Sequence, residues 1–171
     1  MITPAYVRTM AAYNLEMNRR LYDAAERLSD ENRRAPHGAF WGSIHGTLAH
    51  LLWADQMWMS RFDGWARPEA ELARSADDAG SFDALRARRE AADARLGSWA
   101  QEVGADWLGA DQTWFSGASG REMTMPRAIL VTHLFNHQTH HRGQVHAMLT
   151  AAGEATGATD LPFVLRTRPD A

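Results

Sequence analysis

Hydrophobic residues recur at helical spacing in four stretches of the chain, and this pattern predicts four long helices. Thr3 followed by Pro4 is a typical helix start, in which a capping side chain precedes a proline in the first turn. Ser43 and Ser81 are equally suited to cap the second and third helices. The predicted helices cover residues 4–28, 44–62, 82–102 and 124–152, and Gly153 ends the last one.

Between these helices the periodicity is interrupted. Residues 29–42 contain Pro36 and Gly38 and are expected to form a connection. Residues 64–80 are rich in Pro, Ala, Asp and Ser and are long enough for a crossover with one helical turn. Segments 112–115 and 122–125 flank a Ser- and Gly-rich stretch and predict a small β-hairpin before the last helix. A short apolar piece, 161–165, follows near the end.

The fold class expected from this order is all-α, a four-helix bundle with long crossover connections and one small β-hairpin. The 171 residues match the usual size of one domain, so residues 1–171 are assigned to a single helical-bundle domain. Such bundles build their sites from side chains that converge between helices.

The composition then excludes several kinds of chemistry. Cysteine is absent, which removes disulfides, thiolate nucleophiles and cysteine-ligated metals. All 18 basic residues are arginine, so no lysine can form a Schiff base. A net charge of −3 with no dense basic cluster argues against a nucleic-acid partner. With no long apolar stretch and no signal-peptide pattern, no membrane partner and a cytoplasmic location are expected.

Five of the eight histidines fall between residues 133 and 146, within the last predicted helix. On a helical wheel His137 and His141 lie inside or beside the apolar arc, whereas His133, His140 and His146 lie outside it. His137 and His141 are four residues apart, about 6 Å along the axis, which lets two imidazoles share a metal ion. In a chain without cysteine, this pair favours a metal site over two hydrogen-bonded core histidines.

A metal site with an open position needs a third protein ligand. The second predicted helix offers His45, His50 and Asp55. The wheel places Asp55 in the apolar arc and the two histidines on opposite flanks, and it does not choose between them.

The residues around these histidines resemble the DinB family (DinB/YfiT-like proteins). The resemblance covers nearly the whole chain, and its most specific part is the block His-x-x-x-His-Arg-Gly-Gln. It is carried by Asn136-His137-Gln138-Thr139-His140-His141-Arg142-Gly143-Gln144-Val145, by Gly46-Thr47-Leu48-Ala49-His50-Leu51-Leu52-Trp53-Ala54-Asp55 and by Thr159-Asp160-Leu161. The resemblance implies a divalent metal, commonly zinc or nickel, with His50, His137 and His141 as ligands. His45, His133 and His140 are not ligands by this resemblance.

Other residues near the expected site have alternative interpretations. Asp55 is either a hydrogen-bonded structural acid or a partner that orients a ligand histidine or pairs with Arg142. Gln144 either contacts substrate or a metal-bound water, or faces solvent. The apolar residues Trp53, Met57, Trp58 and Met59 nearly encircle the second helix, and they indicate a core with a subunit interface or, alternatively, a substrate-pocket wall. The arginines of 86–89 are expected on a solvated helix face.

The function expected from these observations is a metal-dependent enzyme that activates a thiol or water for a small-molecule substrate. Some relatives in the family are thiol-dependent transferases or isomerases, and a cysteine-free chain would take a low-molecular-weight thiol as cofactor. The alternatives are a metal-dependent hydrolase, a stress-associated metal-binding protein without turnover, and a structural dimer with buried histidines. A homodimer is expected, and stabilisation by the metal is expected to fade below about pH 6, where free histidine is protonated.

Overall fold

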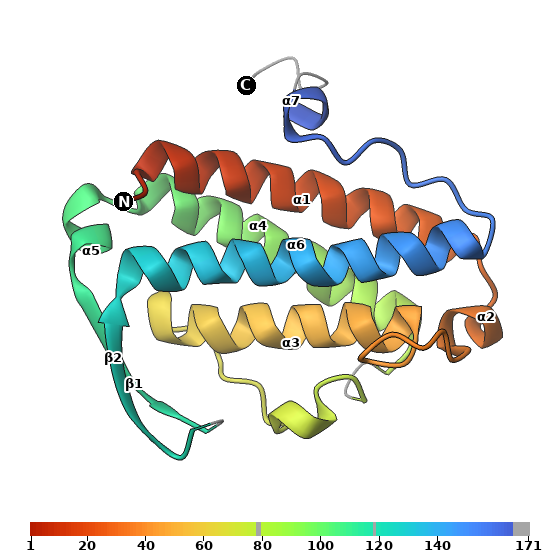
Figure 1. Ribbon diagram of the computed structural model, residues 1–171, viewed down its shortest axis with the longest axis horizontal. Helices are drawn as coiled ribbons and strands as arrows, with labels where there is room; N and C mark the ends of the chain where they lie inside the picture. Colours follow the sequence, from red (N-terminus) through yellow and green to blue (C-terminus); the bar gives the residue numbers. More distant parts are fainter. Residues whose placement is uncertain (78–79, 118, 166–171) are drawn as a thin grey trace.

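The computed structural model describes residues 1–77, 80–117 and 119–165 (Figure 1). These residues form a mostly helical structure with one two-stranded antiparallel sheet. Four long helices lie side by side and account for most of the molecule (Figure 1). They are α1 (Pro4–Glu26), α3 (Ile44–Phe62), α4 (Phe82–Glu102) and α6 (Arg127–Ala151).

Three of the four helix starts are capped as the sequence predicts. The side chains of Thr3, Ser43 and Ser81 each accept a hydrogen bond from a backbone N–H three residues later. These bonds satisfy amide groups that have no partner inside the helix. Helix α6 differs, because Thr124 and Pro126 belong to the preceding strand and the helix begins at Arg127 without a side-chain cap.

Short helices occupy parts of the connections. The segment after α1, predicted as a plain connection, contains α2 (Asp30–Arg34), which is capped by Ser29. The segment after α4 contains α5 (Ala105–Gly109), which the sequence pattern did not predict. The expected helical turn in the crossover is η1 (Leu72–Arg74), and the last apolar piece forms α7 (Leu161–Val164).

The predicted β-hairpin is confirmed. Strands β1 (Asp111–Ser116) and β2 (Arg121–Pro126) pair antiparallel, with Trp114 opposite Met123. Gly120 in the connecting turn has a φ of 65°, a left-handed conformation that glycine adopts without steric cost. The hairpin extends from the start of α6 past the end of α3 (Figure 1), and Trp114 on β1 contacts Trp58 on α3.

Helix α1 packs on α4 and α6, and α3 packs on the same two helices. Figure 1 shows that α3 and α4 run in the same direction, so the chain between them crosses back along the length of the helices. Residues 64–77 form the described part of this connection, and 78–79, the rest of the predicted crossover apart from Gly80, lie outside the described residues. The core between the helices contains fully buried side chains from all four, among them Leu21, Leu48, Leu85 and Leu134.

Arg89 lies within this core, which corrects the expectation that the arginines of 86–89 occupy a solvated face. Its guanidinium lies 2.7 Å from Asp55 on α3 and 2.8 Å from Asp93 on α4. Asn18 on α1 donates a hydrogen bond to the Asp93 carboxylate. Arg86 and Arg88 are more exposed, as expected. Arg89 therefore connects three helices through a buried ion-pair cluster.

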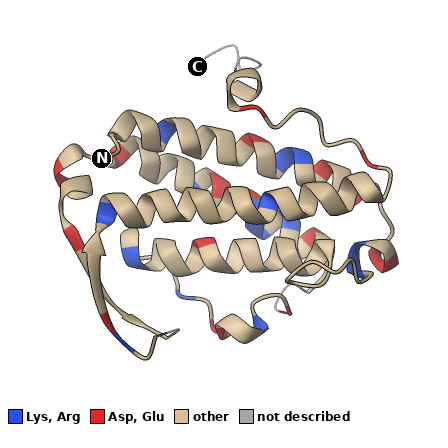
Figure 2. Ribbon diagram, in the orientation of Figure 1, with Lys and Arg blue, Asp and Glu red and all other residues tan. Residues whose placement is uncertain are grey.

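Most other charged residues lie on the outside, and Figure 2 shows acidic and basic residues interspersed along the helices. Within residues 1–77, 80–117 and 119–165, no helix has both the length and the apolar character needed to cross a membrane.

Candidate metal centre

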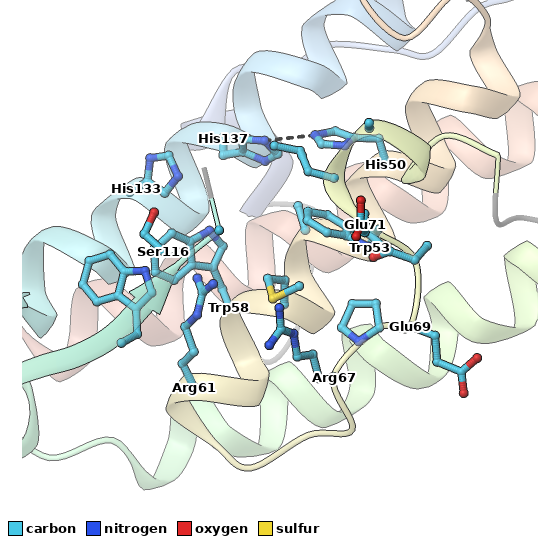
Figure 3. Close-up of a pocket in the computed structure, with 18 residues that line it drawn as sticks. His50, Trp53, Trp58, Arg61, Arg67, Glu69, Glu71, Ser116, His133 and His137 are labelled. Atoms are coloured by element: carbon cyan, nitrogen blue, oxygen red, sulfur yellow. Dashed lines mark hydrogen bonds between the residues drawn. The ribbon is translucent and has the colours of Figure 1, made fainter. Parts of the chain in front are cut away.

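Three histidines converge between α3 and α6. His50 projects from α3, while His137 and His141 lie one turn apart on α6. One ring nitrogen from each lies within 4.8 Å of the others, and the Nε2 atoms of His50 and His137 are 3.2 Å apart. Figure 3 shows His50 and His137 facing each other across this gap. The structure thus brings together the three residues that the family resemblance implied.

A serine on the crossover fixes the proton position of His50. Ser75 directly follows η1, and its Oγ lies 2.8 Å from His50 Nδ1. The same hydroxyl donates its hydrogen to the Leu72 carbonyl at 2.7 Å. Because that hydrogen is already used, Ser75 Oγ accepts from the Nδ1–H of His50. The Nε2 atom of His50 therefore carries its lone pair toward the other two histidines.

A glutamine has the same effect on His141. The Oε1 atom of Gln144 lies 2.7 Å from His141 Nδ1, and an amide oxygen can only accept a hydrogen bond. The Nδ1 atom of His141 is therefore protonated, which leaves Nε2 as its lone-pair atom. Gln144 was expected either to contact substrate or a metal-bound water or to face solvent, and the structure shows it hydrogen-bonded to a candidate ligand.

Two tryptophans restrict the His50 ring. Trp41 stacks on it with ring centroids 4.0 Å apart, and Trp53 lies on it at 6.0 Å with the planes nearly parallel. Trp41 comes from the connection before α3 and Trp53 from α3 itself. Packing and the Ser75 hydrogen bond together hold His50 in one orientation.

All three histidines are neutral in this environment. Burial, reinforced by the neighbouring histidines, lowers the pKa of His50 and of His137 to about 3. Burial also lowers the pKa of His141, although the Gln144 hydrogen bond acts in the opposite direction. Neutral imidazole is the form that coordinates metals.

This donor set fits a divalent metal ion. At 3.2 Å, the Nε2 atoms of His50 and His137 need either a proton or a cation between them, because two lone pairs would repel. The fixed Nδ1 protons of His50 and His141 direct two lone pairs toward the same space. Three converging imidazole nitrogens are a donor set that divalent metal ions accept.

Asp55 and Arg142 do not contact the histidine cluster. Asp55 is fully buried against Arg89, which corrects both the idea that it orients a ligand histidine and the idea that it pairs with Arg142. Arg142 donates instead to Asn14 on α1, and its Cζ atom lies over the face of the Tyr13 ring, 5.4 Å from the ring centroid. Burial lowers the pKa of Arg142 to about 10. Both residues connect helices rather than serve the candidate site.

The additional histidines occupy different surroundings. His45 is buried away from the cluster, and its ring nitrogens have no hydrogen-bond partner in the part of the chain that the structure describes. His140 is exposed, with its ring against that of His141. His133 lies against Trp58, 5.3 Å away between ring centroids, and 5.8 Å from the ring of His137. None of the three belongs to the convergent set, which consists of His50, His137 and His141.

An open pocket of about 730 Å³ begins at His50 and His137 (Figure 3). Its walls come from α3, from the crossover around residues 67–73 and from the hairpin. Trp53, Met57 and Trp58 line it, which favours the pocket-wall interpretation of this part of α3, whereas Met59 is buried in the core. The pocket gives a small molecule access to the candidate metal centre.

Sequence reasoning missed Ser75 and Trp41 as supports of His50. Both lie in connections without hydrophobic periodicity, so only the folded chain places them beside α3. It also missed Trp114 as part of the pocket wall, because the position of the hairpin relative to α3 is a property of the tertiary structure.

Fold and site together define a mostly helical protein with an internal three-histidine site beside an open pocket. The sequence model of the DinB family matches residues 1–170, and the chain belongs to this family. A search of curated proteins found no match to this chain.

Proposed function

We propose that this protein is a divalent-metal-dependent enzyme of the DinB-type four-helix bundle, with His50, His137 and His141 as the metal ligands. The observation that carries the proposal is the convergence of three neutral imidazoles, two of them with Nδ1 protons held by Ser75 and Gln144. Zinc and nickel are the proposed metals because both accept imidazole ligands readily.

A divalent ion at this position would supply a Lewis acid that lowers the pKa of a coordinated thiol or water. The protein contributes a preorganised donor set, since Ser75, Gln144 and the stacked tryptophans fix ring orientation before any ligand arrives. Trp53 and Trp58 line the pocket beside His50 and His137 and offer apolar surface to a small-molecule substrate.

The proposed reaction class is transfer or isomerisation that uses a low-molecular-weight thiol. The chain has no cysteine, so such a thiol would come from a cofactor. The pocket beside His50 and His137 is large enough for the thiol and part of a small-molecule substrate. Hydrolysis by an activated water, and metal binding without turnover, are the alternatives that the experiment below separates.

The proposal includes a homodimer located in the cytoplasm, without a nucleic-acid or membrane partner. Light scattering at micromolar concentration tests the dimer, and a single-chain mass of about 19 kDa would rule it out.

The experiment that tests the proposal uses the chain loaded with cobalt(II), a spectroscopic substitute for zinc. Adding 2-mercaptoethanol is expected to produce a sulfur-to-cobalt charge-transfer band in the wild type and none in His50→Ala. Cobalt binding without this band, accompanied by hydrolysis of an activated ester, would identify the hydrolase. Cobalt binding with neither activity would indicate a metal-binding protein without turnover. Failure to bind cobalt would overturn the proposal as a whole.

A further inference from the structure

The pocket has a second end, remote from His50 and His137, where two arginines enter it. Arg61 lies in the last turn of α3 and Arg67 in the segment that follows, and both line the same pocket as His50 and His137. Figure 3 shows both guanidinium groups directed into the pocket, while the carboxylate of Glu69 points away from it. From His50 to Arg61 the helix rises about 16 Å, so the two ends are well separated.

Aromatic rings hold one of these guanidinium groups in place. Arg61 lies 4.5 Å from the ring centroid of Trp58 and 5.8 Å from that of Trp114 on β1. The two rings also contact each other edge to face at 5.8 Å. Cation–π contacts engage the flat faces of a guanidinium and leave its N–H edge available for bidentate hydrogen bonds. The hairpin therefore helps to preorganise a donor group in the pocket.

Neither arginine has an anionic partner among the described residues. Arg61 and Arg67 form no ion pair or hydrogen bond there, whereas Arg86 on α4 forms ion pairs with Asp23, Glu26 and Glu90. Burial and the nearby charge of Arg67 lower the pKa of Arg61. Glu69 and Glu71 also line this pocket, but neither forms an ion pair with the two arginines among the described residues. The two cations therefore repel each other, and an anion bound by both would remove this repulsion.

We propose that Arg61 and Arg67 form an anion subsite that binds the carboxylate of a small organic substrate. The apolar body of this substrate would lie along Trp58, Met57 and Trp53, with its far end toward His50 and His137. The pocket volume of about 730 Å³ is within the usual range for small-molecule sites. That the substrate reacts at its end near His50 and His137 rests on the proposed function. Anion binding by Arg61 and Arg67 does not depend on that function.

The test is isothermal titration calorimetry with three matched probes, 4-phenylbutanoate, 4-phenylbutanamide and 4-phenylbutylammonium. The chain is treated with a chelator, so that a carboxylate cannot bind through the metal. A charge-assisted hydrogen-bonded contact should make the carboxylate bind about tenfold more tightly than the amide. The ammonium probe should bind more weakly than the amide. Arg61→Gln and Arg67→Gln should each reduce the preference for the carboxylate.

Arg95→Gln is the matched control, because Arg95 makes a similar cation–π contact with Trp65, at 4.8 Å, outside this pocket. It should leave the carboxylate preference unchanged. Arg67 is exposed and lies outside the helices, so its replacement keeps the test valid if Arg61→Gln disturbs the fold. Equal binding of carboxylate and amide, or an unchanged preference in Arg67→Gln, would overturn the subsite.

Repeating the titration with the zinc-loaded chain separates this inference from the proposed function. A carboxylate preference that depends on Arg67 in a chain that fails to bind zinc would support the subsite and overturn the metal proposal. Zinc binding without any carboxylate preference in the chelated chain would overturn the subsite and leave the metal proposal intact.

Discussion

His50 Nδ1 donates to Ser75 Oγ at 2.8 Å, and this bond joins the middle of α3 to the crossover that follows it. The crossover therefore has two roles. It forms one wall of the pocket, through residues 67–73, and it sets the tautomer of a candidate metal ligand. Because Ser75 is itself held by the Leu72 carbonyl, the orientation of His50 depends on the fold of the η1 turn.

Replacing Ser75 with alanine is expected to weaken zinc binding without unfolding the chain. Loss of a hydrogen bond that orients a histidine ligand typically costs about 10- to 100-fold in metal affinity. Competition with a chromophoric chelator measures this change. Ser60→Ala is the control, because Ser60 Oγ donates to the Met57 carbonyl and does not contact His50. Equal affinities in the two variants would show that the Ser75 hydroxyl does not support the site.

Replacing Asp55 with alanine is expected to affect stability and not metal binding. The change leaves Arg89 buried with Asp93 as its remaining acidic partner, and breaking a buried pair in this way costs about 3–5 kcal/mol. Denaturant unfolding of the chelated chain measures the loss. Asp77→Ala, which removes an exposed ion pair with Arg74, should cost about 0–1 kcal/mol. A lower zinc affinity in Asp55→Ala would contradict the purely structural role.

Chelation is expected to lower the melting temperature without unfolding the protein. The ion would join α3 to α6 and bind the folded chain preferentially. This preference adds about 2.7 kcal/mol to the free energy of unfolding when the free metal concentration is a hundredfold above Kd. The core between the four long helices is formed by apolar side chains and does not depend on the ion. Melting curves with zinc and with chelator at pH 7.5 measure the difference. Coincident curves would contradict a shared metal site.

The metal-free chain is expected to lose stability as the pH falls from about 6.5 toward about 3. In this window the unfolded histidines are protonated, while burial keeps the pKa of His50 and His137 near 3 and that of His45 near 4. Asp93 acts in the opposite sense, because burial raises its pKa to about 6 and favours the folded state at low pH. Three histidines act against one aspartate, so the net effect of lowering the pH is a loss of folding stability. Denaturant unfolding at several pH values measures the trend.

The additional stability from zinc should persist at pH 5. The sequence alone predicted that it would fade below about pH 6, but that value applies to an exposed histidine. In the folded chain burial lowers the pKa of all three ligands, so protons compete with zinc only at lower pH. The difference in melting temperature between zinc-loaded and chelated chain at pH 7.5 and pH 5 tests this. A difference that vanishes by pH 6 would place the histidines in a solvent-like environment.

Periodicity predicted the parts of this structure that depend on local sequence. The capping serines marked two helix starts, and the spacing of His137 and His141 placed both on one face of α6. The wheel could not choose between His45 and His50, because α3 is buried on most of its circumference. That choice came from the family resemblance, and the structure places His50, and not His45, beside His137 and His141.

Arg89 and Ser75 show what local patterns leave out. Three arginines within residues 86–89 are typical of a solvated helix face. Arg89 is nevertheless buried, because Asp55 and Asp93 compensate its charge. Its partner Asp55 lies on another helix, which no local pattern reveals. Ser75 is one of several serines in connecting segments, and only the return of the crossover along α3 brings it to His50.

The most direct test of the metal centre is elemental analysis of His50→Ala and His45→Ala beside the wild type after dialysis against trace zinc. His50 belongs to the convergent set, whereas His45 is buried elsewhere on the same helix, so the pair is matched in residue type and burial. Circular dichroism confirms that both variants are folded. We expect one zinc per chain in the wild type and in His45→Ala, and none in His50→Ala. Equal zinc content in the two variants would contradict the three-histidine site.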